Sequence, residues 1–168
     1  MTEFLEHALQ YVGRGWRVFP VHSVIKGKCT CGRDCGKNAG KHPRIKGGCN
    51  AASVSPEQIA AWWKKWPKAN IGIATGAVSG LVVLDLDGAK GVAKLKALLG
   101  TVKLPPTACV ATGRGWHLYF RALQAEPTGC SSDGGLDVRG EGGYVIAPPS
   151  IHASGARYRW INPQEFGA

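Results

Sequence analysis

The stretch LVVLDLDG, residues 81 to 88, constrains the fold most strongly, because its apolar residues predict a buried strand that also carries two carboxylates. Side chains alternate across a strand, so Asp85 and Asp87 share one face while Leu84 and Leu86 share the other. Two like charges on one face repel, and burial disfavours their ionised forms further. The acidic pair therefore requires a positive partner, and the pattern favours a divalent cation, Mg2+ or Mn2+.

A two-metal site for phosphoryl transfer also needs an acidic group from a neighbouring strand. Asp137, in GLDVRGEGGYV, begins a predicted strand, whereas its competitors Asp133 and Glu141 have the surroundings of loop residues. His117 lies in ATGRGWHLYF, a predicted strand on which a lone histidine is commonly a core residue bonded to a backbone carbonyl. Arg114 and the glycines beside it favour the other interpretation, a contact with phosphate groups.

The remaining pattern predicts an α+β chain. Apolar residues at helical spacing indicate a helix over residues 2–13 that Thr2 caps. A second helix begins after Ser55 and ends at Pro67, and Gly88 opens a third. About seven strands follow from the alternating segments, and two of them, residues 108–112 and 116–122, form a hairpin. Helices early in the chain and hairpins late indicate a mostly antiparallel sheet.

A segment of about residues 26–49 is rich in Gly, Lys and Cys and has almost no apolar side chains, so it cannot pack a core of its own. It contains the spacing C-x-C-x3-C-x6-H, formed by Cys29, Cys31, Cys35 and His42. Three thiolates and one imidazole are a suitable tetrahedral set for structural zinc, with Cys49 as a reserve ligand. The alternative, unrelated surface cysteines, would leave reactive thiols on a segment with no other source of order.

The net charge of +10, from 21 Lys and Arg against 11 Asp and Glu, attracts polyanions such as nucleic acid or nucleotides. Zinc would hold the basic residues of the loop on a rigid scaffold that phosphates could contact, although a merely solvated loop is the other interpretation. These residues are Lys28, Arg33, Lys37, Lys41, Arg44 and Lys46. No signal-peptide pattern and no membrane-length apolar run occurs, which predicts a cytoplasmic protein with no membrane partner.

The tryptophans raise the question of base stacking with a single-stranded template. Trp62, Trp63 and Trp66 follow helical intervals, so at least two of them are expected in the core. Trp116 is adjacent to His117 and is therefore expected on the opposite side of its strand.

Three segments in order, LDLDG, TGRGWHLYF and GLDVRGEGGYVIAPPSIHASGARYRW, resemble the primase-polymerase (prim-pol) domain of the archaeo-eukaryotic primase superfamily, phage or plasmid replication type. The resemblance extends from GWRVFPV onward. It implies an RRM-like, mostly antiparallel catalytic sheet with an N-terminal α/β portion. We expect a single domain over residues 1–168, with the zinc-binding insertion at about 26–49. The resemblance also implies that Asp85, Asp87 and Asp137 bind Mg2+ or Mn2+, and that His117 contacts the phosphates of the incoming nucleotide.

The function implied by this resemblance is a template-directed DNA primase/polymerase, a nucleotidyltransferase that uses two metal ions. Its partners would be single-stranded or primed DNA, dNTPs or NTPs, and a helicase domain or protein, in a prokaryotic cell or bacterial host. Candidate residues for the triphosphate are Arg114, Arg139 and Lys41, with hydroxyl contacts from Ser150 and Thr75.

Two other functions compete with this one. A non-catalytic, zinc-stabilised DNA-binding replication module would need no acidic trio, yet Asp85 and Asp87 are both present. The D-x-D-G strand end also resembles the nucleophile motif of haloacid-dehalogenase-type phosphohydrolases. That family usually has Thr where this chain has Ala89, and its late acidic motif is not found here, so hydrolysis by an Asp nucleophile is the more distant alternative.

Overall fold

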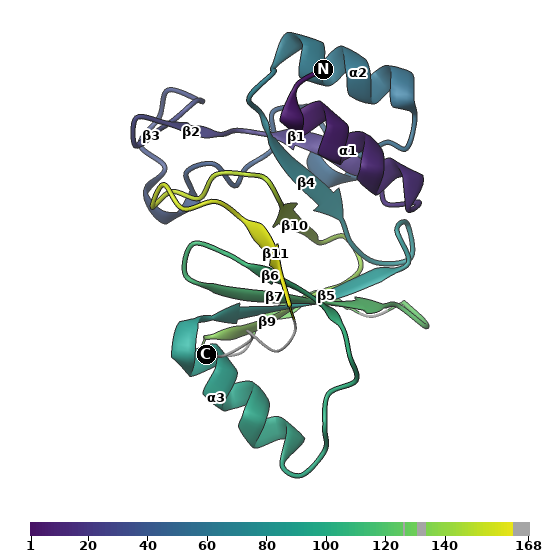
Figure 1. The fold of residues 1–168 in the computed structure, drawn as a ribbon, viewed down its shortest axis with the longest axis vertical. Helices are drawn as coiled ribbons and strands as arrows, with labels where there is room; N and C mark the ends of the chain where they lie inside the picture. Colours follow the sequence, from purple (N-terminus) through teal and green to yellow (C-terminus); the bar gives the residue numbers. More distant parts are fainter. Residues whose placement is uncertain (126, 131–133, 163–168) are drawn as a thin grey trace.

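The structure of the protein is a computed structural model that describes residues 1–125, 127–130 and 134–162 (Figure 1). The helices are α1 (Glu3–Gly13), α2 (Pro56–Lys65) and α3 (Gly88–Leu99), with short 3-10 turns η1 (Gly36–Asn38) and η2 (Gly48–Ala51). The strands are β1 (Val18–Val21), β2 (Val24–Ile25), β3 (Lys28–Cys29), β4 (Asn70–Ala74), β5 (Leu81–Asp87), β6 (Ala108–Ala111), β7 (Gly115–Arg121), β8 (Gly129–Cys130), β9 (Leu136–Arg139), β10 (Tyr144–Ala147) and β11 (Arg159–Ile161).

Both early helices begin where their caps predict. The Thr2 hydroxyl accepts a hydrogen bond from Leu5 N, and the Ser55 hydroxyl accepts one from Gln58 N. Each cap satisfies a backbone donor that has no partner within the helix. Trp63 is buried in the first core, and Trp62 and Trp66 pack against that core, as the helical spacing predicts.

The first layer is an antiparallel sheet in which, within the described ranges, β4 lies between β1 and β10. Helices α1 and α2 cover it at the top of Figure 1. Strand β10 comes from the last third of the chain, so the N-terminal layer is completed by a late strand. Ile71 and Ile73 of the central strand are fully buried in the core below the helices.

The second layer is an antiparallel sheet with the order β11-β6-β7-β5-β9-β8 over the described residues. One face packs against α3, at the bottom of Figure 1, through a second core that includes Leu86, Leu95 and Leu118. The opposite face contributes Val83, Val110 and others to the first core. Each face of β5 thus has a different environment, which follows from the alternation of its side chains.

The Cys-rich segment forms the small β2–β3 hairpin and the turns beyond it. Backbone bonds join it to β1, from His22 N to His42 O and from Arg44 N to Pro20 O. Its own buried contacts are few, since Val24, Cys29 and Ala39 form its small apolar cluster.

The predicted α+β class and antiparallel sheets are confirmed. The hairpin predicted at residues 108–112 and 116–122 is the β6–β7 pair. Among the described residues, no helix is both long and apolar enough to cross a membrane.

Candidate active site

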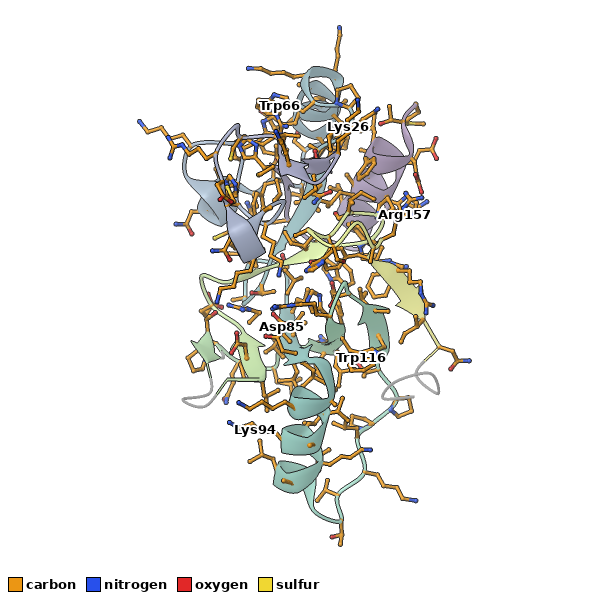
Figure 2. The ribbon with its side chains drawn as sticks, turned by 90° about the vertical axis from the view of Figure 1, so that its left-hand side faces the viewer. Lys26, Trp66, Asp85, Lys94, Trp116 and Arg157 are labelled. Carbon is orange, nitrogen blue, oxygen red and sulfur yellow. The ribbon has the colours of Figure 1, made fainter. Side chains whose placement is uncertain are left out.

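The acidic residues meet because β5 lies between β7 and β9. In this register Asp85 is directly opposite His117 on one side and Asp137 on the other. Residues directly opposite each other in adjacent strands have side chains on the same face, and Asp87 follows Asp85 by two residues on that face. Figure 2 shows Asp85 midway between the helical layer and α3. The pleat and the register together place all four side chains on the face away from α3.

Two arginines supply positive charge to these carboxylates. Arg139 Nη2 lies 2.8 Å from Asp137 Oδ2 and 3.3 Å from Asp85 Oδ2, so one nitrogen joins two acids of adjacent strands. Arg114 Nη2 lies 3.2 Å from Asp87 Oδ1 in a more exposed pair. The positive partner expected from the sequence is thus, in this conformation, a guanidinium group at each position.

His117 bonds a carboxylate rather than a backbone carbonyl. Its Nε2 lies 3.4 Å from Asp85 Oδ1, its side chain is 7% exposed, and its Nδ1 is buried with no hydrogen-bond partner. Burial by itself raises the pKa of Asp85, but the bond and charge of His117, together with Arg139, outweigh it and lower that pKa to about 2. Asp85 therefore stays ionised although it is largely enclosed.

These side chains line a cavity of about 470 Å3 between the two layers and the Cys-rich loop. Of the residues predicted from the sequence, these line the cavity: Asp85, Asp87, Asp137, His117, Arg114, Arg139, Lys37 and Lys41. Three carboxylates face four basic side chains here, those of Lys37, Lys41, Arg114 and Arg139, so the cavity offers ligands for a hard cation and donors for phosphate groups.

Lys41 reaches the cavity from the loop, and its backbone position is fixed by neighbours. Tyr144 donates from its hydroxyl to Lys41 O at 3.0 Å, and Asn70 donates to Gly40 O at 2.9 Å. Burial lowers the pKa of Lys41, as does the charge of Arg114, while Asp85 and Asp87 act in the opposite direction. A half-buried ammonium group near two other cations favours an anionic ligand.

The predicted zinc ligands come together. His42 Nε2 lies 3.2 Å from Cys29 Sγ and 3.3 Å from Cys35 Sγ, and Cys31 Sγ lies 3.3 Å from Cys35 Sγ. All four ligand atoms lie within 4.8 Å of one another. The ligand atoms around a tetrahedral zinc are roughly 3.5–4 Å apart, so this set fits the ion. The reserve ligand Cys49 is outside the cluster, with its Sγ 3.5 Å from Gly142 O.

The carboxylates fit a catalytic cation by their chemistry but are not closed around one. Among the described residues, the Cys and His cluster brings its ligand atoms within 4.8 Å of one another, and the three carboxylates do not. Asp85 and Asp137 converge on Arg139, whereas Asp87 pairs separately with Arg114. Oxygen donors of this kind suit Mg2+ or Mn2+.

Comparison with known families decides the affiliation. The model of the bifunctional DNA primase/polymerase N-terminal domain, Prim-Pol, matches residues 8–167. The chain belongs to the Prim-Pol family. A search of curated proteins found no match. The Prim-Pol family implies a nucleotidyltransferase type of enzyme with DNA and nucleotide substrates.

Two hydroxyls predicted to contact nucleotide in this Prim-Pol chain do not line the cavity. Thr75 is 1% exposed and donates to Gly140 O at 2.7 Å, and Ser150 is fully buried and accepts from Ile71 N at 2.9 Å. Both hydroxyls hold backbone segments together. Their sequence surroundings could not reveal this, because the partners are distant in the chain.

The competitors for the third acid have other positions. Asp133 lies outside the described residues. Glu141 accepts a hydrogen bond through Oε1 from Ala77 N, at the turn before β5. Among the described competitors, Asp137 is the one whose carboxylate shares a cation with Asp85.

His152 lines the cavity and was not singled out from the sequence. It is 5% exposed, and Ser154 N donates to its Nδ1 at 3.1 Å, so the neutral ring carries its proton on Nε2. The ring packs against Gly113, where a side-chain carbon would lie 2.0 Å from Nδ1. Burial, Lys41 and Arg114 lower the pKa of His152. In the sequence His152 follows the APPS turn closely, and a turn has no alternation of side chains from which the direction of the His152 ring could be predicted.

Proposed function

We propose that this Prim-Pol chain is a template-directed DNA primase/polymerase domain, which transfers a nucleotide from a nucleoside triphosphate to a 3′ hydroxyl. The observation that carries the proposal is the convergence of Asp85 and Asp137 on one nitrogen of Arg139, with Asp87 on the same strand face. Because Asp85 and Asp137 lie on adjacent strands and both contact Arg139, the space between their carboxylates stabilises a positive charge. A phosphoryl-transfer centre needs such a place beside donors for phosphate.

Asp85, Asp87 and Asp137 would hold the catalytic Mg2+ or Mn2+ ions. When bound, the ions would activate the attacking hydroxyl and neutralise charge on the leaving pyrophosphate. Arg114 and Lys41 would bind the triphosphate from the hairpin and the loop, and Arg139 would add to that binding. His117 would keep Asp85 ionised and oriented, and contact the incoming phosphates. His152 would donate a hydrogen bond from Nε2 to the nucleotide.

The cysteine and histidine cluster would hold a structural zinc ion. The segment between two of its ligands, Cys35 and His42, contributes Lys37, Asn38 and Lys41 to the cavity wall. Zinc would therefore fix one wall of the nucleotide site as well as supply folding energy that burial cannot. We also infer a helicase domain or protein as partner and a phage or plasmid replication role in a prokaryotic cytoplasm.

A primer-extension assay tests the catalytic proposal. Wild-type protein, Asp85→Asn, Asp137→Asn and the distant acid control Glu6→Gln are given labelled dNTPs or NTPs with Mg2+ or Mn2+, on primed and unprimed templates. We expect incorporation by wild type and Glu6→Gln, and a loss of at least 100-fold in both aspartate variants, typical of removed metal ligands. Full incorporation by the double variant Asp85→Ala with Asp87→Ala would refute the mechanism. DNA binding without any incorporation would favour the non-catalytic module instead.

A further inference from the structure

A second cavity lies on the other face of the catalytic sheet. It has a volume of about 410 Å3 and is formed by the β6–β7 turn together with β11. Ala111 is opposite Trp116 in β7 and opposite Arg159 in β11, so these three residues share one face. That face is opposite to the one that carries His117. We call this cavity, lined by residues 111–116, Arg159 and Ile161, the hairpin groove.

The hairpin groove is lined by small residues of the turn and by two large side chains. Ala111 carries only a methyl group on this face, whereas Gly113 packs against the His152 ring and Gly115 against the backbone of Leu86. The half-buried Trp116 and the exposed Arg159 lie on the two strands that flank Ala111. Figure 2 shows Trp116 just above α3, at nearly the same height as Asp85. An aromatic ring and a guanidinium group that line one groove are features that can bind one base and one phosphate of a nucleic-acid strand.

The charge of the hairpin groove differs from that of the active-site cavity. Its lining holds Arg159 and Arg114, whose guanidinium also pairs with Asp87, and, over the residues that the structure describes, no carboxylate. The active-site cavity holds three carboxylates beside its cations. A polyanion can therefore enter the hairpin groove without added metal ions, and the net charge of +10 favours its approach.

The two cavities adjoin the same turn between β6 and β7. Thr112 and Arg114 line both of them. In a template-directed reaction the template strand must pass beside the incoming nucleotide and then leave the active-site cavity. The shared turn gives the strand a way over the end of the sheet into the hairpin groove.

We propose that the hairpin groove binds the single-stranded template next to the nucleotide being copied, with a base stacked on Trp116 and a phosphate held by Arg159. The proposal rests on the proposed function for its occupant, and it assigns the groove to template rather than to nucleoside triphosphate. A protein ligand is the other class of occupant, and the experiment below separates the two.

Binding of a fluorescently labelled oligo(dT) is measured by anisotropy without nucleotide and without added Mg2+ or Mn2+, so that no catalytic step enters the result. We expect Trp116→Leu to bind at least about five-fold more weakly than wild type, because stacking is lost. Arg159→Ala should bind more weakly at low salt and reduce the slope of log affinity against log salt by about one.

Each variant has a matched control. For Arg159→Ala the control is Arg157→Ala, which removes the same charge two residues earlier, where the arginine forms an exposed ion pair with Glu3. For Trp116→Leu the control is Trp62→Leu, which changes a half-buried tryptophan on α2. Both controls should bind like wild type. Thermal unfolding checks each variant, and if Trp116→Leu does not fold, the exposed Arg159→Ala decides the result.

Three outcomes would overturn the proposal: no binding of oligo(dT) by wild type, unchanged binding in Arg159→Ala, or equal losses in Arg159→Ala and Arg157→Ala. Failure of the proposed function is recognised separately. In that case oligo(dT) binds and depends on Trp116 and Arg159, but the extension assay shows no incorporation.

Discussion

Asp85 remains charged at the boundary between the two layers because its two oxygens have different partners. His117 bonds Oδ1 from β7, and Arg139 bonds Oδ2 from β9. Each partner is fixed by the strand register, and neither depends on a long flexible loop. The ionised carboxylate of Asp85 therefore contributes to the stability of the fold.

This contribution predicts a specific dependence on acidity. The folded pKa of Asp85 is about 2, below the unfolded value of about 3.9, so its stabilisation is fully present above roughly pH 5 and is lost as pH falls through 2. Urea unfolding of wild type and Asp85→Asn between pH 2 and 6 should show a difference in free energy that narrows by on the order of 2 kcal/mol toward acid. A constant difference across this range would contradict the assignment.

His152 gives a second prediction at this scale. His152→Ala should raise the Kd for a nucleoside triphosphate by about ten-fold, the value of one hydrogen bond to a charged group. His152→Gln, which keeps a side-chain N–H, should recover part of the affinity. The measurement is titration of a fluorescent nucleotide, with His7→Ala on α1 as a control outside the cavity. Equal losses in the Ala and Gln variants would show that the ring only fills space beside Gly113.

Single residues were predictable where one strand determines their direction. Alternation predicted that Asp85 and Asp87 share a face and that Trp116 opposes His117, and the structure has both. It could not predict the Arg139 bridge, because that depends on which strands are neighbours. Thr75 and Ser150 were expected at the nucleotide, yet their hydroxyls bond the backbone of distant segments.

At the scale of elements, the Cys-rich loop differs from the helices and strands around it. Its apolar cluster is small, and its inner end is joined to other elements through Gly40, Lys41 and Arg44. The element therefore presents Lys41 to the candidate active site while having little core of its own. A bound ion at the four ligands would fix what packing leaves free.

Loss of zinc ligands should consequently affect nucleotide binding. Cys31→Ser should release the ion, measured by elemental analysis, lower the melting temperature and weaken nucleotide binding by about ten-fold as Lys41 loses its fixed position. Cys49→Ser is the matched control, since that thiol lies outside the cluster, and it should keep the ion and the affinity. Unchanged nucleotide binding in zinc-free Cys31→Ser would show that the loop acts separately from the active site.

Elements were predictable where local chemistry defines their ends. Thr2 and Ser55 cap their helices as expected, because the capping bonds span three residues. The sequence of a strand did not predict which other strand it pairs with, because pairing depends on residues far away in the chain. β10 follows β9 closely in the chain but pairs with β4 in the other layer.

At the scale of the whole molecule, one buried side chain joins three parts of the chain. Asn70 Nδ2 donates to Gly40 O at 2.9 Å and to Ile151 O at 2.8 Å, and its Oδ1 accepts from Ile151 N at 2.9 Å. It is fully buried on β4. The loop that carries Lys41 and the segment that carries His152 are thus held to the same strand.

Asn70→Ala should leave these three backbone groups without partners and reduce the free energy of unfolding by about 3 kcal/mol, since each buried unpaired group costs about 1–3 kcal/mol. Urea unfolding measures this, with the exposed Asn50→Ala as the control. Nucleotide affinity should fall as well, because both attached segments line the candidate active-site cavity. A stability equal to that of Asn50→Ala would mean that water replaces the amide.

The return of β10 to the first layer has a consequence for how this protein can be divided. The chain starts in one sheet, crosses to the other, and comes back to finish the first. If the chain were divided between β4 and β5, the first fragment would lack β10, the edge strand of its sheet, and the second fragment would carry β10 without the strand that it pairs with. A fragment that keeps the first sheet complete must therefore include β10, Tyr144–Ala147, together with everything that precedes it in the chain.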